Sequence, residues 1–200
     1  QYSVKNPSVS ADGNTLYFAS DKPGGYGNFD IYSAPIRKNG NVSKATNMGQ
    51  TINTEGQEMF PHISETNTLY FSSNGHLGLG GLDVFFAELV DGAPGPVRNI
   101  GMPVNGNSDD FAFSVNEDTG EGFVSSNREG GKGSDDIYTL KNLQPICDVF
   151  MTVTVKDSTT GLIIEGASVS IQDAEGLVFG TKTSNAEGIV EFSIECDADT

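Results

Sequence analysis

The sequence has no tryptophan, only two cysteines and only 11 basic residues among its 200. No apolar run is longer than four residues, which excludes a membrane-spanning helix and the apolar core of a signal peptide within this sequence. The 27 acidic side chains give a formal net charge of -16, and no cluster of Lys and Arg interrupts it. Because such a surface repels phosphate backbones, nucleic acid is not expected as a partner.

The apolar residues occur in many patches of two to four, such as residues 16–19 and 84–87, separated by Gly, Asn, Asp, Ser and Pro. This spacing is typical of short strands joined by turns. No stretch keeps the 3.6-residue periodicity of a helix for long enough to predict one. The sequence therefore predicts an all-β protein.

An internal repeat of 53 residues is the strongest signal in the sequence. Asp30, Asp83 and Asp136 follow one another at this spacing, and each precedes an aliphatic and then an aromatic residue. The connecting segments 48–53 and 100–105 also resemble each other, so the repeat covers residues 1–143. Two glycine columns keep the same spacing: Gly25, Gly78 and Gly131, and Gly27, Gly80 and Gly133.

We interpret the three repeat aspartates as structural. A carboxylate at the entry to a strand can accept hydrogen bonds from backbone N–H groups of the preceding glycine turn, which glycine alone leaves loose. Calcium is the alternative, because residues 130–135 read Gly-Gly-Lys-Gly-Ser-Asp, like the calcium-binding nonapeptide repeats. However, the corresponding turn of the first repeat has one residue too many before Asp30. We expect no metal and no cofactor.

Each repeat reads as strand, turn, strand, glycine-rich turn, strand and a more polar edge segment. In the first repeat the strands are predicted at residues 6–10, 15–20 and 29–36. Four short strands in such a unit are what a β-propeller blade requires, and propellers have typically about 4 to 8 blades. Three repeats therefore predict part of a larger propeller, with further blades before residue 1 or other protein packed against it.

The repeat resembles a known family. The pattern Pro-x-(Ile/Val)-Ser, then Asp-Gly-Asn-Thr-Leu-Tyr-Phe-(Ala/Ser)-Ser-(Asp/Asn), then a glycine-rich turn closing in Asp-(Ile/Val)-(Tyr/Phe), is similar to WD-like β-propeller repeats. Such repeats are found in TolB and in OmpA-family envelope proteins of the Bacteroidetes type. The third repeat departs from the pattern at residues 118–121, which read Asp-Thr-Gly-Glu, and lacks the proline.

A second module is predicted over residues 144–200, because the repeat ends at a proline and a cleaner alternation of apolar and polar residues begins. Strands are predicted near residues 149–155, 167–171, 178–182 and 189–194. Its pattern Val-x-Asp-x-x-Thr-Gly, then Gly-Ala-x-Val-x-Ile, then Asn-x-x-Gly-x-x-x-Phe, resembles the carboxypeptidase regulatory-like domain. The resemblance implies a transthyretin-like β-sandwich, which we expect to be cut short after residue 196.

The two cysteines, Cys147 and Cys196, bracket this second module. Their positions favour a disulfide in an oxidising compartment, which would tie the ends of two strands together. The alternative is a pair of reduced, buried thiols.

Motifs for catalysis are missing from the sequence. It contains neither a phosphate-binding Gly-x-x-x-x-Gly-Lys-(Ser/Thr) loop nor a Gly-x-Ser-x-Gly elbow. His62 stands in a repeat column otherwise occupied by Ser8, which favours packing, and His76 lies in a glycine turn, where we expect solvent exposure. Neither has the spacing of zinc ligands. The sequence therefore predicts a protein that is not an enzyme.

The resemblance implies a structural and interaction protein of a bacterial envelope, periplasmic and associated with the outer membrane. Its expected partners are other envelope proteins, including type IX secretion components, and peptidoglycan through a domain outside these residues. One alternative is a propeller that binds a glycan or peptide at its mouth, although Tyr26 is the only aromatic residue well inside a glycine turn. The other is an accessory domain of a larger hydrolase.

Overall fold

The computed structural model describes residues 2–141, 148–172 and 178–195 of the chain. These residues form strands, turns and bends with no helix among them, so the all-β prediction is confirmed for this part of the protein. No described segment is a helix long and apolar enough to cross a membrane. The chain divides into two compact units, Gln1–Gln144 and Pro145–Thr200.

The first sheet is an antiparallel meander of β1 (Val4–Val9), β2 (Thr15–Ser20), β3 (Asp30–Pro35) and β4 (Thr46–Asn47), in that order. β1 begins before its predicted start, because its first residues pair with the end of β2 on the far side of a bulge. Turns rich in Gly, Asn and Asp join the strands, as the spacing of the sequence predicts.

The second sheet repeats this plan. Its strands β5 (Glu58–Ile63), β6 (Thr68–Ser73) and β7 (Asp83–Val90) correspond to β1, β2 and β3, and β9 (Arg98–Asn99) pairs with β7 as β4 pairs with β3. An additional short strand, β8 (Ala93–Pro94), pairs with the end of β7. The 53-residue period is thus a period of the structure as well.

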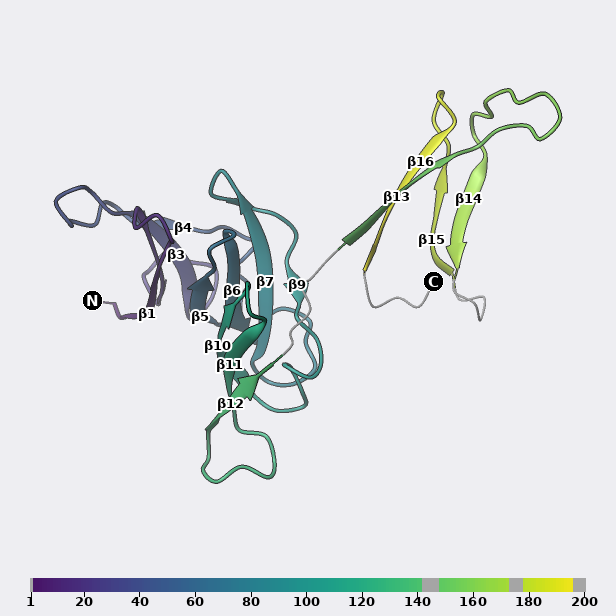
Figure 1. The fold of residues 1–200 in the computed structure, drawn as a ribbon. Coiled ribbons are helices and arrows are strands. Elements are labelled where there is room, and N and C mark those ends of the chain that lie inside the picture. Colours follow the sequence, from purple (N-terminus) through teal and green to yellow (C-terminus); the bar gives the residue numbers. More distant parts are fainter. Residues whose placement is uncertain (1, 142–147, 173–177, 196–200) are drawn as a thin grey trace. The chain divides into compact units, whose positions relative to one another are not determined.

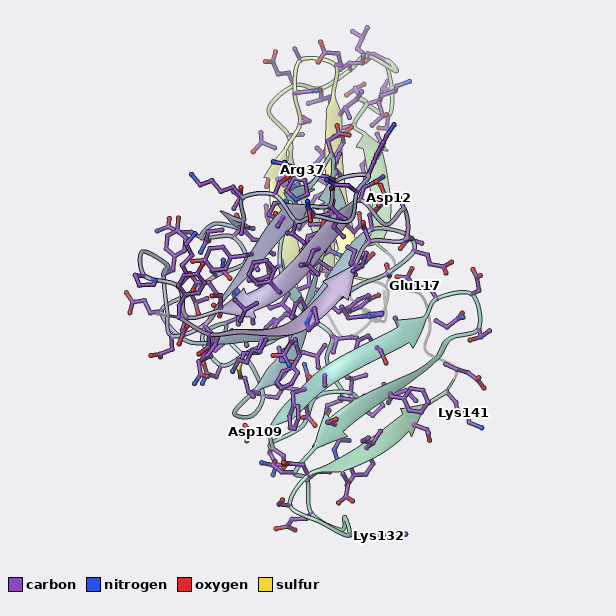
Figure 2. All side chains as sticks on the ribbon, turned by 90° about the vertical axis from the view of Figure 1, so that its left-hand side faces the viewer. Asp12, Arg37, Asp109, Glu117, Lys132 and Lys141 are labelled. Carbon is purple, nitrogen blue, oxygen red and sulfur yellow. The ribbon has the colours of Figure 1, made fainter. Side chains whose placement is uncertain are left out.

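The third sheet has three described strands, β10 (Asp110–Asn116), β11 (Glu121–Ser126) and β12 (Asp136–Leu140). No described residue pairs with the outer side of β12 in the way that β4 and β9 pair in the other sheets. Figure 2 shows this sheet, with Lys132 at the tip of the turn between β11 and β12. The three sheets do not form a closed ring among the described residues, and the propeller remains a prediction.

The first strand of each of these three sheets carries a bulge at the same place. Asn6, Phe60 and Ala112 have φ angles of 53°, 52° and 52°, a left-handed conformation that is uncommon for residues other than glycine. An extra residue of this kind bends a strand and increases its twist. The register shifts between Lys5 and Ser8, between Met59 and His62, and between Phe111 and Ser114.

The core lies between the sheets, which follow one another in chain order (Figure 1). Leu69 and Phe71 of β6 pack in a cluster with residues of the first sheet, such as Ile31. Tyr70, which points to the opposite face of the same strand, belongs to a cluster shared with the third sheet, where Val124 is fully buried. The middle sheet is therefore apolar on both faces, and each sheet provides one wall of its neighbour's core.

The second unit consists of two antiparallel pairs among its described residues. β13 (Asp148–Thr154) pairs with β16 (Ile189–Glu195), and β14 (Ser168–Gln172) pairs with β15 (Val178–Thr183). Val190 and Phe192 are buried against partly buried residues of β13 and β14. The β-sandwich remains a prediction, and the proposed Cys147–Cys196 bridge lies outside the described residues.

A matched pair of substitutions tests this packing. Ile31 is 0% exposed between the first two sheets, whereas Ile137, in the same repeat column, is 75% exposed. We expect Ile31→Ala to lower the free energy of unfolding by about 2–5 kcal/mol through lost burial and an unfilled cavity. Ile137→Ala should change it by less than about 0.5 kcal/mol. Urea unfolding followed by circular dichroism measures both, and equal effects would contradict this account.

Candidate functional site

Each repeat aspartate closes the glycine turn that precedes its strand. Asp30 accepts hydrogen bonds from the N–H groups of Tyr26 (2.7 Å) and Gly27 (3.0 Å). The carboxylate that accepts these hydrogen bonds is buried in the first two repeats. The other two aspartates repeat the contacts, Asp83 with Leu79 and Gly80 at 3.0 and 2.9 Å, and Asp136 with Lys132 and Gly133 at 2.7 and 3.0 Å.

The first glycine column makes room for these carboxylates. A Cβ atom built on Gly25 would collide with the carboxylate of Asp30, and the same holds for Gly78 with Asp83 and for Gly131 with Asp136. A side chain at this position would therefore push the aspartate off its N–H donors. Glycine recurs in this column because the aspartate carboxylate lies too close to the backbone to leave room for a side chain.

The second glycine column makes room for the next repeat. A Cβ on Gly27 would collide with the carbonyl oxygens of Thr54 and Gly56, which belong to the segment that leads into the second sheet. Gly80 meets the corresponding carbonyls of the segment that leads into the third sheet. At Gly133 the nearest atom is the carbonyl oxygen of Asp135 at 3.4 Å, an ordinary contact. Among the described residues, no incoming segment lies against the third copy of this column.

The connecting segments end in an asparagine that holds two sheets together. Asn53 accepts a hydrogen bond at Oδ1 from the N–H of Ile31 (2.7 Å) and donates from Nδ2 to the carbonyl of the same residue (3.0 Å). Asn105 makes both contacts with Val84, each at 2.8 Å. A carboxamide can both accept and donate, so it can continue the pairing of a strand edge beyond the end of the short strand β4 or β9. These residues will be called the asparagine clamps.

The sequence shows that segments 48–53 and 100–105 resemble each other, but it does not by itself identify the asparagine clamps. Each clamp is supported by a second asparagine, which lies directly before its segment. Asn53 donates to Oδ1 of Asn47, and Asn105 donates to Oδ1 of Asn99, both at 2.8 Å. The signal that could have found them is an asparagine pair six residues apart in both connecting segments.

Further polar side chains fix the entry of each first strand. Asn74 accepts from the N–H of Gln57 (2.9 Å) and Asn127 accepts from the N–H of Asp109 (2.8 Å). Glu58, fully buried, accepts from Ser73 and from Thr54. The acidic residues of these joints are thus engaged with backbone and hydroxyl donors.

Asp110 is likewise fully buried and forms an ion pair with Arg128. The arginine also donates to the carbonyl of Val104 at 2.7 Å and lies over the ring of Tyr138. No group of three metal-ligating side chains occurs among residues 2–141, 148–172 and 178–195.

The two histidines differ from one another in the structure. The prediction for His76 was wrong, because its Nε2 lies 2.9 Å from the carbonyl oxygen of Ile52 and its ring packs against Phe71 and Phe85. His62 is half-buried, and this burial lowers the pKa of its imidazole, although a hydrogen bond with the backbone of Val115 and the charge of Glu117 oppose the shift. Neither belongs to a nucleophile–base arrangement within the described residues.

A shallow groove of about 200 Å³ runs along the bulges of the three first strands. Its walls include the bulge residues Asn6, Phe60 and Ala112. Oδ1 of Asn6 and Nε2 of His62 are buried beside it without a hydrogen-bond partner in the described chain. Such atoms are uncommon in folded proteins and are candidates for contact with a ligand.

Comparison with known proteins identifies no family for this chain. No protein-family model and no curated protein sequence matches this chain. Among solved structures, the chain is similar to the crystal structure of TolB from Acinetobacter baumannii, with a TM-score of 0.46 and 11% identity over 96% of this chain. The chain spans 43% of that structure's length, and a likeness this weak carries no argument about fold or function.

The asparagine clamps can be tested by truncation. Asn105→Ala would leave the buried N–H of Val84 without its partner, while the C=O of Val84 would keep only the N–H of Ile100, and we expect the change to lower the free energy of unfolding by about 1–3 kcal/mol. The control is Asn107→Ala, an exposed asparagine of the same loop, which should cost less than about 0.5 kcal/mol. Chemical denaturation compares the two, and a mild effect of Asn105→Ala would show that the clamp is dispensable.

Asp83 predicts a dependence of stability on pH. Burial raises the pKa of its carboxyl above the ordinary 3.8, and the charges of Asp110 and Asp109 add to this, whereas hydrogen bonds from Gly80 and Leu79 oppose it. The folded protein thus binds this proton more tightly than the unfolded chain does. The contribution of Asp83 to stability should therefore fall as the pH rises from 3.8 to the raised folded pKa.

The measurement is the free energy of unfolding of the wild type and of Asp83→Asn between about pH 3 and 7. The stability of the wild type relative to the variant should decrease across that window and then stay constant. A relative stability that instead grows with pH would mean that the folded-state pKa is depressed.

Proposed function

We propose that this chain is a non-catalytic scaffold of the bacterial cell envelope that binds other proteins. The observation that carries the proposal is the use of its polar residues. Asp30, Asp83, Glu58 and Asp110 are buried, and their hydrogen bonds or ion pairs hold turns and neighbouring sheets in place. Carboxylates are residues that an enzyme can use for acid–base chemistry, and these four are instead engaged in contacts that hold turns and sheets.

Both ends of the three-sheet stack offer surface for association. The third sheet exposes Phe123 and Ile137, whose counterparts in the other sheets are buried. Beside the outer face of the first sheet lies a cavity of about 300 Å³, lined by Phe18, Ala34 and residues of the segment before β4. Repeat units bury such faces by stacking on further units or partners.

The envelope location is part of the proposal and rests on the sequence resemblance to OmpA-family proteins. On this basis the protein is periplasmic and associated with the outer membrane. Its partners are other envelope proteins, with type IX secretion components as one class, and it reaches peptidoglycan through a domain outside these residues. The strongly acidic composition suits a soluble interaction module.

A second candidate function is favoured by the groove along the bulges. Two polar atoms of this groove, on Asn6 and His62, have no hydrogen-bond partner among the described residues, and together with the nearby ring of Phe60 they would suit a peptide or a glycan. This would make the chain a ligand-binding module instead of a scaffold.

The test is affinity purification of the full-length protein from its native envelope, followed by mass spectrometry, with the wild type beside His62→Ala. The scaffold function predicts that outer-membrane proteins and peptidoglycan fragments are recovered equally with both. Recovery of glycans or peptides that disappears with His62→Ala, in the absence of envelope proteins, would overturn the proposal in favour of the second candidate.

A further inference from the structure

We infer that the outer edge of β12 binds the connecting segment of a further sheet repeat, with the chemistry Asn-(Met/Ile)-Gly-x-x-(Ile/Val)-Asn. This inference rests on the proposed scaffold function and names the chemistry of one partner. The bound segment would add a short strand along β12 and place its second asparagine on the backbone of Ile137. Its evidence is the contrast between the third repeat and the first two.

The backbone of Ile137 matches that of Ile31 and Val84, the residues that receive the asparagine clamps. Ile137 pairs with Ser125 as Ile31 pairs with Ala19, so its N–H and C=O face away from β11. In the described chain no asparagine reaches them. Ile137 is 75% exposed, whereas Ile31 and Val84 are 0% exposed.

A short strand accompanies each clamp in the first two sheets, and the corresponding position beside β12 has no strand among the described residues. β4 pairs with Tyr32 and Ser33, and β9 pairs with Phe85 and Phe86. The repeat period assigns the same role to Tyr138 and Thr139, for which no partner strand is described. An open strand edge of this kind is a template for an added strand.

Gly133 gives independent support. In the first two repeats this glycine column is packed against carbonyl oxygens of the incoming segment, at Gly27 and at Gly80. A Cβ on Gly133 would meet only ordinary contacts within its own turn, and the φ angle of Gly133 is not in the left-handed region, so the turn itself does not require glycine there. The absence of a side chain at Gly133 has a physical reason once a connecting segment lies against it.

The chemistry of the partner follows from the two occupied joints. An asparagine carboxamide matches the N–H and C=O of one residue, and the preceding Ile52 or Val104 is buried between sheets. Both such segments of this chain are already engaged at their own joints. A second copy of the chain therefore has none to spare, and the occupant is the connecting segment of another repeat.

The experiment is an NMR titration of the isotope-labelled chain of residues 1–200 with a synthetic peptide that copies residues 46–57. The amide signals of residues 133–139 should shift in a saturable way. A peptide with the change Asn53→Ala should bind at least about tenfold more weakly, because it loses both clamp contacts. Failure of the unmodified peptide to shift these signals would overturn the inference.

A protein variant provides the matched control. Gly133→Ala should leave the unfolding transition unchanged, because the new methyl group meets only an ordinary contact in the free chain. It should weaken binding of the peptide at least about tenfold, since the equivalent methyl at Gly27 would collide with the bound segment. Equal binding by both proteins would contradict the proposed geometry.

Two results separate this inference from its alternatives. Shifts at residues 133–139 that grow with protein concentration without peptide would identify a second copy as the occupant, and would overturn the assignment. If the peptide fails while the envelope purification still recovers outer-membrane proteins, the edge inference falls and the scaffold function stands.

Discussion

The rest of the repeat unit depends on the asparagine clamps. Asn53 and Asn105 each take both backbone groups of one strand residue, so the edge of one sheet is satisfied by the segment that begins the next. Buried backbone groups without partners are costly, and the apolar core cannot close over such an edge unless they are paired. The clamp thereby fixes where the next repeat begins relative to the last strand of the previous one.

The apolar faces and the clamps act together. Alternating side chains of β6 pack toward both neighbours, with Leu69 on one side and Tyr70 on the other. A sheet that is apolar on both faces is stable only between other sheets, as in other repeat proteins. The exposed Phe123 and the cavity beside Phe18 lie at the two ends of this arrangement, on the faces that are proposed above to bind other proteins.

Charge in this molecule is used in two ways. The net charge of -16 keeps the surface acidic, while a few carboxylates are taken into the joints and surrounded by N–H and O–H donors. Asp83 illustrates the tension, because its Oδ1 is buried without a partner among the described residues and burial raises its pKa. Such groups fix turns without being catalysts.

The sequence by itself determined the period, the all-β class and the aspartate and glycine columns, because short-range patterns of apolar, turn and acidic residues recur at 53-residue spacing. The tertiary structure decided what the second glycine column and the asparagines do. Gly27 meets Thr54 and Gly56, and Asn53 meets Ile31, across more than twenty residues of chain. It also decided the contacts of His76 with Ile52 and Phe85. Contacts between repeats depend on how the sheets stack in space. The spacing of residue types along the chain does not indicate which residues of different repeats come close together.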